Sequence, residues 1–316
     1  MRGLRLLGCG ALAALAMAAA APSRAAPATP AATIASLDAF DAQKKSVVLP
    51  NGLRLAYVEM GNPKGRPVVL IHGYTDNARD WWPLTPYLDK SFRLIIVDIR
   101  GHGGSGKPEC CYTRVDFAYD IKLLLDALKI DKADIVGHSL GSIITQTFAE
   151  LWPERTARVV LVSSTGGPRK AAKTGVSTAP APPAFDFRSA IVKLRDPIDP
   201  DSPFMVAWWS SPTPVDEAFI QRQRQDAAKI PVKVWLAVLD QGLEGVDLQA
   251  TLPKLKAPTL LIWGGKDQII DMEGRETLRE GLPAATVKVF EQLGHNPFWE
   301  DAPGVAAEIN RFLGHP

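Results

Sequence analysis

The chain has 316 residues, of which 46% are hydrophobic and 22% are charged, so it can bury a substantial core and does not have the composition of a disordered protein. Its 36 basic and 34 acidic side chains leave a formal charge of +2. These charges are spread along the chain without a dense Lys/Arg block, which excludes the electrostatic signature of a nucleic-acid-binding protein. We expect one large domain with insertions.

The first 25 residues have the order of a secretory signal peptide. Arg2 and Arg5 form a basic start, residues 6–21 form an apolar run, and small residues follow. The run is short against the ~20 residues that a membrane-spanning helix needs, and two glycines interrupt it. We therefore expect residues 1–25 to be cleaved, and the mature protein to be periplasmic or secreted without stable membrane insertion.

The folded part is expected to begin at residue 46, after a flexible leader over residues 26–45 that starts with an Ala/Pro-rich stretch. Two apolar runs within residues 46–60 flank Asn51-Gly52, a strong signal for a tight turn between antiparallel strands. The sequence therefore predicts a hairpin that opens a sheet.

Further along the chain, strand and helix patterns alternate. Nearly continuous apolar runs are typical of strands buried on both faces, as in a parallel sheet, and they cover residues 68–71, 94–97, 135–136, 159–162 and 259–263, with another strand expected at 286–290. Helical periodicity covers residues 117–128, 140–151 and 305–313. The alternation predicts an α/β fold with a mostly parallel central sheet and helices on both faces.

The alternation stops over residues 166–257, where prolines are frequent. A disordered linker is one interpretation of this segment, but its aromatic side chains supply more apolar surface than a solvated linker carries: Phe204, Trp208, Trp209, Phe219 and Trp235. We expect a folded helical cap inserted between two parts of the core, residues 46–165 and 258–316, and placed over the carboxyl edge of the sheet.

A Gly-x-Ser-x-Gly sequence at residues 137–141 lies directly between a predicted strand and a predicted helix. A serine in such a sharp turn takes up strained backbone angles, and the flanking glycines let neighbouring chain approach. The turn exposes the hydroxyl at the sheet edge, at the positive end of a helix. Ser139 is therefore the predicted nucleophile.

A serine hydroxyl needs a nearby base, and the base needs a partner that fixes its tautomer. His295 lies in a loop between the last predicted strand and the last helix, and Asp267 follows a buried strand by a Gly-rich turn. We predict His295 as general base and Asp267 as the acid that orients it. Asp240 and Asp247 in the cap are the remaining acid candidates, without that strand-to-turn context.

The oxyanion of a tetrahedral intermediate needs backbone donors. His72 and Gly73 follow a buried strand, so the next amide, that of Tyr74, is predicted to form an oxyanion hole with the amide of Leu140. His72 itself is expected to be a structural hydrogen-bonding residue. The predicted substrate-binding residues are His72, Gly73, His138, Trp208, Trp209 and Phe298.

Taken together, these landmarks resemble the α/β-hydrolase superfamily, from about residue 46 to the carboxyl terminus. They are His72-Gly73, residues 98–105, residues 137–141, Asp267 and Gly294-His295. Within the superfamily the chain is similar to capped carboxylesterases, enol-lactonases and haloperoxidase-like serine hydrolases. The resemblance implies a two-step reaction through an acyl-enzyme, without a metal or an organic cofactor.

The expected reaction is hydrolysis of a small-molecule carboxylic ester or lactone. Relatives that attack with an aspartate are disfavoured by Ser139, and carbon–carbon bond hydrolases tend to carry a second glycine where this chain has Ser142. Carbon–carbon bond hydrolysis, acyl transfer and perhydrolysis on the same triad stay open, as does a non-catalytic ligand-binding protein of this fold. The sequence leaves the oligomeric state open.

Adjacent cysteines stand at positions 110 and 111. They can remain thiols or form a strained vicinal disulfide. Their spacing matches no metal-binding cysteine pattern, so no metal site is predicted.

Overall fold

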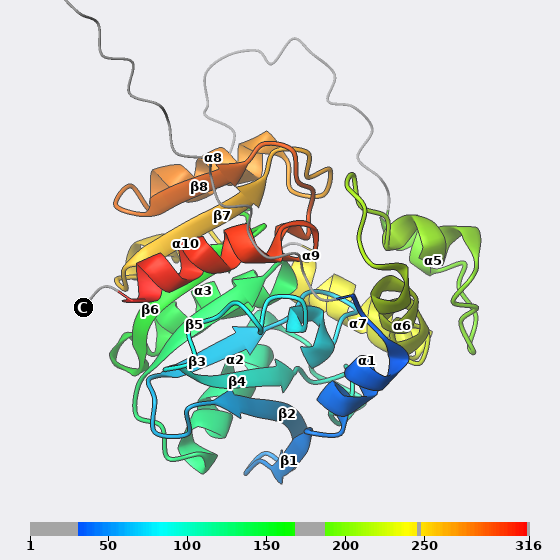
Figure 1. The fold of residues 1–316 in the computed structure, drawn as a ribbon, viewed down its shortest axis with the longest axis horizontal. Coiled ribbons are helices and arrows are strands. Elements are labelled where there is room, and N and C mark those ends of the chain that lie inside the picture. Colours follow the sequence, from blue (N-terminus) through cyan, green and yellow to red (C-terminus); the bar gives the residue numbers. More distant parts are fainter. Residues whose placement is uncertain (1–30, 168–186, 245–247, 315–316) are drawn as a thin grey trace, which may run out of the picture.

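An eight-stranded sheet runs through the centre of the molecule (Figure 1). The computed structural model describes residues 31–167, 187–244 and 248–314. The strands are β1 (Lys45–Val48), β2 (Arg54–Gly61), β3 (Pro67–Ile71), β4 (Arg93–Asp98), β5 (Ala133–His138), β6 (Thr156–Val162), β7 (Thr259–Gly264) and β8 (Thr286–Phe290). Their spatial order is β1-β2-β4-β3-β5-β6-β7-β8. Both pairings of β2 are antiparallel and the pairings from β4 to β8 are parallel, which confirms the predicted mostly parallel sheet.

The predicted hairpin is formed by β1 and β2. The Leu49 amide donates to the Leu53 carbonyl at 2.8 Å, and the Gly52 amide donates to the Leu49 carbonyl at 2.9 Å. Gly52 has φ +84°, a conformation that glycine adopts without steric cost. The loop therefore contains Pro50 as well as Asn51 and Gly52, and is one residue longer than a two-residue Asn-Gly turn.

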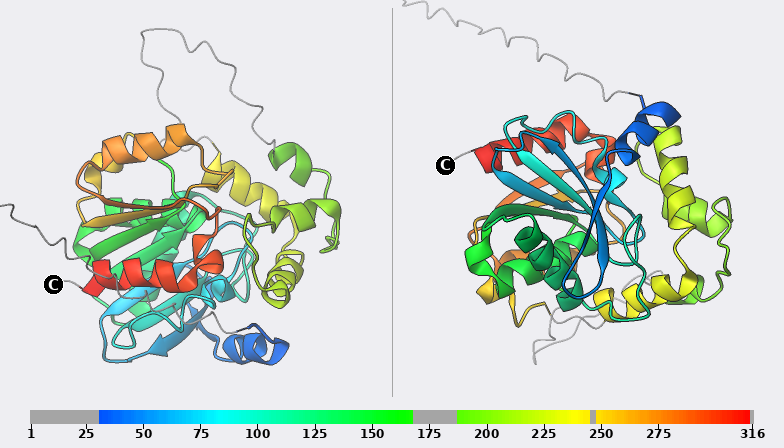
Figure 2. Two further views of the ribbon diagram at one scale, coloured as in Figure 1. Left: turned by 45° about the horizontal axis from the view of Figure 1, so that its top comes forward. Right: turned by 90° about the horizontal axis from the view of Figure 1, so that it is seen from below.

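Helices cover both faces of the sheet (Figure 2). The helices α2 (Arg114–Ala127) and α3 (Leu140–Leu151) lie together on one face, and α10 (Ala302–Gly314) lies on the other. Two further helices are α8 (Met272–Gly281) and α9 (Pro297–Glu300). Every residue of β5 and β7 is buried, because side chains on both sides of these strands are covered by helices or loops.

In the described part of the segment between β6 and β7, the α-helices are α4 (Phe187–Ile191), α5 (Pro203–Trp208), α6 (Glu217–Ala227) and α7 (Val232–Val238). We refer to them and their connections as the cap; it lies beside the ends of the parallel strands (Figure 1). Trp209, Phe219 and Trp235 are at most 4% exposed, so the cap is packed and is not a solvated linker. Residues 168–186 and 245–247 of the predicted insertion lie outside the described residues.

Helix α1 (Ile34–Asp41) corrects the predicted leader. Residues 34–41 form a helix whose cap residue Thr33 exchanges side-chain and backbone hydrogen bonds with Ser36, and Leu37 and Phe40 are buried. The expectation of a flexible leader over 26–45 is wrong for this part, because the helix is held by long-range burial that the local composition does not reveal. Residues 1–30, including the predicted signal peptide, lie outside the described residues.

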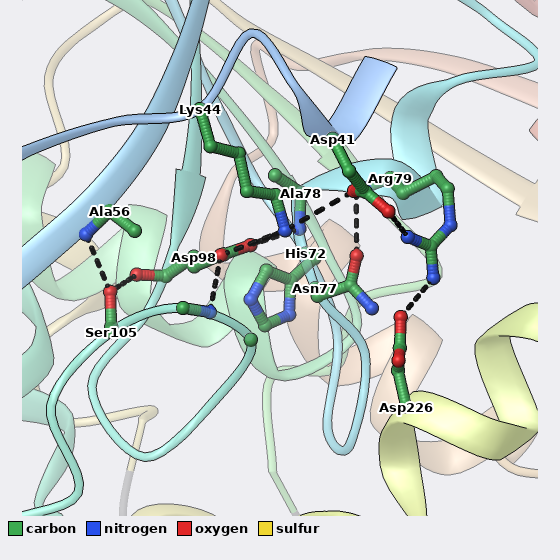
Figure 3. A network of polar contacts seen from close by, with 12 residues as sticks. Asp41, Lys44, Ala56, His72, Asn77, Ala78, Arg79, Asp98, Ser105 and Asp226 are labelled. Carbon is green, nitrogen blue, oxygen red and sulfur yellow. Dashed lines mark hydrogen bonds and ion pairs between the residues drawn. The ribbon is translucent and has the colours of Figure 1, made fainter. Parts of the chain in front are cut away.

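Arg79 links α1 to the cap (Figure 3). It belongs to the short 3-10 helix η1 (Ala78–Trp81), and its fully buried guanidinium contacts Asp41 of α1 and Asp226 of α6. Arg222 of α6 pairs in addition with Asp38 of α1 at 3.0 Å. Charged contacts therefore join three segments that are far apart in the sequence. Within the described residues, no helix combines the length and apolar character needed to cross a membrane.

Candidate active site

Ser139 occupies the sharp turn between the end of β5 and the start of α3. Its backbone has φ +51° and ψ −118°, a strained conformation for a residue with a side chain. A Cβ at Gly137 would lie 2.2 Å from the Gly141 carbonyl oxygen, and one at Gly141 would lie 2.1 Å from the Ile71 carbonyl oxygen. The two glycines are therefore required by close backbone approach, and they allow β3, β5 and α3 to hold the serine at the sheet edge.

His295 and Asp267 meet at the carboxyl ends of β8 and β7. The Nδ1 of His295 lies 3.0 Å from both carboxylate oxygens of Asp267. Asp267 also accepts from the amides of Ile269 at 2.8 Å and Ile270 at 3.2 Å. Burial works against the charged form, but His295 and the two amides outweigh it and hold the pKa of Asp267 below its ordinary value. Asp267 is thus an ionised acceptor that fixes the ring of His295.

Ser139 and His295 line the same cavity, which has a volume of about 170 Å³. Among the described residues no hydrogen bond joins the two side chains. Catalytic hydrogen bonds are often long in the free enzyme and tighten only when substrate binds, so their absence here does not exclude the pair. Ser139 and His295 come from distant parts of the chain and line one cavity.

The two amides predicted to form an oxyanion hole are those of Tyr74 and Leu140. Both residues line the cavity, and neither amide donates to an acceptor within the described part of the chain. Leu140 is the first residue of α3, so its amide also lies at the positive end of the helix dipole. The hydroxyl of Tyr74 donates to the Trp235 carbonyl at 2.7 Å, which ties the turn after β3 to the cap.

Three predicted substrate-binding residues, His138, Trp208 and Trp209, line the cavity. The other three, His72, Gly73 and Phe298, are not part of its lining. Phe298 is fully buried and stacks on Trp81 with ring centroids 4.5 Å apart. Its prediction as a pocket residue is wrong because the short helix after His295 turns the ring into the core.

His72 is buried beneath the site. Its Nδ1 donates to the Gly73 carbonyl at 2.8 Å, and its Nε2 accepts from the Ile99 amide at 3.2 Å. Burial, together with the nearby His102, holds the pKa of His72 well below its usual range. The structure therefore gives His72 the structural hydrogen-bonding role expected of it and no contact with the cavity.

Of the two remaining acid candidates, the structure describes only Asp240, which does not contact His295. Asp240 forms a surface ion pair with Arg188, and Asp247 lies outside the described residues. Cys110 and Cys111 are exposed, and neither is in a disulfide.

Several cavity residues carry no sequence signal that singled them out. They come from the loops after β3, β6, β7 and β8, from α3 and α9, from the cap and from the helical segment Leu239–Leu243 that follows α7: Asp76, Ile143, Ser163, Thr165, Phe187, Leu239, Leu243, Ile269, Ile270, Asn296 and Trp299. The adjacent pair Ile269-Ile270 could have been found, because two apolar residues directly after the acid of a Gly-rich turn are poorly explained by an exposed loop. Asp76 is the unexpected member, since burial and the neighbouring Asp80 raise the pKa of Asp76 well above its usual range.

Comparison with known proteins agrees with this geometry. Residues 66–302 match a family described as alpha/beta hydrolase fold. The chain belongs to the α/β-hydrolase fold family. This confirms both the resemblance drawn from the motifs and the predicted fold class.

Individual α/β hydrolases similar to this chain differ in the reactions that their names describe. Lipase 3 of Moraxella sp. (strain TA144) is 27% identical over 278 residues, covering 86% of this chain and 85% of that protein. A 2-hydroxy-6-oxononadienedioate/2-hydroxy-6-oxononatrienedioate hydrolase of Paraburkholderia phymatum is 30% identical over 275 residues, covering 83% and 91%. A solved hydrolase from Pseudomonas aeruginosa PA01 superposes with a TM-score of 0.73 at 25% identity, covering 86% of this chain and 98% of that one.

Proposed function

We propose that this α/β hydrolase cleaves a small-molecule carboxylic ester or lactone, with Ser139 as nucleophile, His295 as general base and Asp267 as the orienting acid. The observation that carries the proposal is the shared cavity. It contains a serine in a strained strand-to-helix turn and an imidazole whose far nitrogen is bound by an ionised carboxylate. This is the arrangement that activates a hydroxyl for attack on a carbonyl carbon.

In the proposed first step, His295 takes the proton of Ser139 as the oxygen attacks the ester carbonyl. The amides of Tyr74 and Leu140 stabilise the resulting oxyanion, and His295 then returns the proton to the leaving alcohol. In the second step, water activated by His295 releases the acid from Ser139. The carboxylate of Asp267, 3.0 Å from Nδ1, stabilises the imidazolium that forms in each step.

The shape around His295 supports a substrate with groups on both sides of the scissile bond. A second cavity of about 470 Å³ shares Phe187, Trp208, Ile269 and His295 with the first. The smaller cavity, with Leu239 and Leu243 in its wall, suits a short apolar group. Lys266 and Gln268 line the larger one, which suits a longer or more polar group.

The test is labelling of the full chain with a fluorophosphonate probe, together with turnover of a panel of short p-nitrophenyl esters and lactones. Ser139→Ala is expected to abolish labelling and to lower turnover by roughly 10⁴-fold or more. Ser163→Ala is a matched control, since Ser163 lines the same cavity but its hydroxyl donates to the His295 carbonyl at 2.7 Å. If folded, probe-labelled wild-type protein turned over no ester or lactone, the assignment of the substrate class would be overturned. The assignment of Ser139 as nucleophile would stand.

Carbon–carbon bond hydrolysis is the second candidate, supported by the 30% identical relative from Paraburkholderia phymatum. The Oγ of Ser142 lies 2.5 Å from the Ser139 carbonyl and 2.6 Å from the Oγ of Ser164, so it lies behind the nucleophile and outside the cavity lining. This position does not discriminate between the two reactions. Cleavage of the carbon–carbon bond of a vinylogous 1,5-diketone, detected by product analysis, would favour the second candidate. Products formed with added alcohol or peroxide would reveal acyl transfer or perhydrolysis. Absence of probe labelling would favour a non-catalytic binding protein.

We also propose that the protein is exported and acts in the periplasm or outside the cell. The support is the order of basic, apolar and small residues over positions 1–25. Fractionation of cells that express the full chain, with amino-terminal sequencing of the recovered protein, tests this. Recovery of uncleaved protein in the cytoplasm would overturn it.

A further inference from the structure

Three buried side chains beside the nucleophile converge on one point. Asp76 comes from the loop after β3, Asp80 from η1, and His138 from the end of β5. One potential ligand atom from each lies within 4.8 Å of the other two. Asp76 is 5% exposed, His138 1% and Asp80 not at all.

Two of these atoms have no hydrogen-bond partner. They are Oδ2 of Asp80 and Nδ1 of His138, which lie 3.7 Å apart, beyond hydrogen-bond distance. A buried polar atom without a partner is destabilising, and more so when it is charged. No Lys or Arg in the described part of the chain pairs with Asp76 or Asp80, so the charge of this cluster is not balanced by a basic side chain.

The opposite ends of the same two side chains are fixed. Nε2 of His138 donates to the His295 carbonyl at 3.1 Å, and Oδ1 of Asp80 accepts from the indole of Trp299 at 2.7 Å. Because a carbonyl can only accept, Nδ1 of the neutral His138 ring carries a lone pair aimed at Asp80. Outer hydrogen bonds of this kind, from the far nitrogen of a histidine and to the far oxygen of a carboxylate, orient metal ligands in proteins.

The space between these groups is kept open by Gly73. A Cβ at this position would lie 2.8 Å from Oδ2 of Asp76 and 2.9 Å from Nδ1 of His138. Asp76 and His138 also line the cavity that contains Ser139, which gives an ion a path from solvent. The cluster therefore has ligand atoms, room and access.

We propose that Asp76, Asp80 and His138 bind a divalent first-row transition ion at the wall of the Ser139 cavity. One imidazole nitrogen and two carboxylates suit ions such as Mn²⁺, Fe²⁺ and Zn²⁺. The charge of the ion balances the two buried carboxylates, and its remaining coordination positions face the cavity, where they take water or an oxygen of a bound ligand. Asp76 and Asp80 lie four residues apart in one segment, whereas His138 comes from the distant strand β5, so no spacing motif in the sequence indicates the site.

The test is a titration of chelator-treated full-length protein with Mn²⁺. Binding is measured as the loss of the electron paramagnetic resonance signal of the free ion. Mn²⁺ is the probe because Cys110 and Cys111 are exposed and thiolates prefer softer ions. Wild type is expected to bind one ion per chain. Asp80→Asn retains an acceptor for Trp299 but removes a ligand charge, so it is expected to weaken binding by about tenfold or more.

Two controls separate this site from other ways to bind an ion. Asp131→Asn changes an exposed carboxylate before β5, at the strand end opposite Ser139, and is expected to bind Mn²⁺ like wild type. His295→Gln keeps the main-chain carbonyl that His138 contacts, and it is also expected to bind like wild type. Loss of binding in His295→Gln would assign the ion to the Asp267–His295 pair and overturn the proposal.

Asp76→Asn is a second ligand variant if Asp80→Asn does not fold. The proposal would be overturned if wild type showed no saturable binding at millimolar Mn²⁺, or if wild type and both aspartate variants bound the ion equally. The cluster would then hold a proton shared between its side chains instead of a metal ion. Fluorophosphonate labelling of Ser139 in the same samples reports on the proposed hydrolase function separately, so failure of one proposal is distinguishable from failure of the other.

Discussion

The central sheet and the cap are held in different ways. Strands β5 and β7 are buried at every position and are hydrogen-bonded to neighbours on both sides. Within the cap, α5 has 6 residues and α7 has 7, lengths at which an isolated helix is not stable in water. The sheet therefore has its own means of stability, whereas the cap helices depend on what they pack against.

The contacts that hold the cap are aromatic and ionic. Trp209 of the cap stacks on Trp299 with centroids 5.8 Å apart, and Trp208 meets Tyr74 edge-on at 5.9 Å. Arg79 supplies the ionic contact through Asp41 and Asp226. The ends of the sheet strands therefore hold Ser139, Asp267 and His295, while the cap contributes Phe187, Trp208 and Trp209 to the apolar wall of the cavity.

The largest expected effect lies at the sheet edge. Asp267→Asn preserves the shape of the side chain but removes the charge that fixes the tautomer of His295, so kcat is expected to fall about 10⁴-fold with little loss of stability. Ester turnover and urea unfolding measure the two quantities. A decrease in kcat of less than tenfold would show that a group other than Asp267 orients His295. It would contradict the proposal that the groups at the sheet edge carry out the reaction.

The attachment of the cap is tested by Arg79→Ala. This change leaves Asp41 and Asp226 without their buried partner, and is expected to lower the free energy of unfolding by about 3 kcal/mol. Lys233→Ala is the control, because its ion pair with Glu109 also joins the cap to the core but is solvent-exposed and is worth about 1 kcal/mol or less. Equal losses in urea unfolding would contradict a special role for the buried contact.

The same contact predicts a pH dependence. Burial of Asp226 opposes ionisation, but Arg79 and Lys229 outweigh it and hold the pKa of Asp226 below its ordinary value of 3.8. A depressed pKa in the folded state means that the stabilisation is present above about pH 4 and is lost as the pH falls through the folded pKa. The stability difference between wild type and Asp226→Asn, measured by urea unfolding, is therefore expected to shrink on acidification below about pH 4. A stability difference that stays constant with pH would show that the charge of Asp226 does not contribute to stability.

The smallest expected effect concerns the wall of the cavity. Trp208→Phe removes the hydrogen bond from the indole to the Thr75 hydroxyl, which is 3.0 Å long and joins cap to core. The expected cost is about 1 kcal/mol, seen as a shift of about fivefold in KM for short esters with kcat retained. Trp152→Phe, at the far end of α3, is expected to leave KM unchanged. A fall in kcat for Trp208→Phe would mean that the cap also positions the reacting groups.

Much of the core was predictable from the sequence because local rules govern it. Apolar runs of strand length located β3 to β7, helical periodicity located α2, α3 and α10, and Gly-x-Ser-x-Gly located the turn at Ser139. His295 and Asp267 followed because the carboxyl ends of parallel strands meet at one edge. Each of these signals is contained within a few neighbouring residues.

Helix α1 and the orientation of Phe298 were predicted wrongly for a common reason. Nothing in the Ala/Pro-rich start of the leader indicates that Leu37 and Phe40 are buried further along, and an aromatic residue next to a catalytic loop looks like a pocket wall. Both depend on which distant surface is available to cover an apolar side chain. Stacking of Phe298 on Trp81 settles that question only after folding.

The sequence by itself determined the order of β3 to β7 with α2, α3 and α10, the strained serine turn and the identity of the three predicted catalytic residues, since backbone periodicity and turn chemistry are local properties. Only the tertiary structure decided which side chains line the cavity, that Arg79 links α1 to the cap, and that Asp76, Asp80 and His138 converge. The physical reason is that burial and electrostatic pairing depend on distances between residues remote in the chain, which no local pattern encodes.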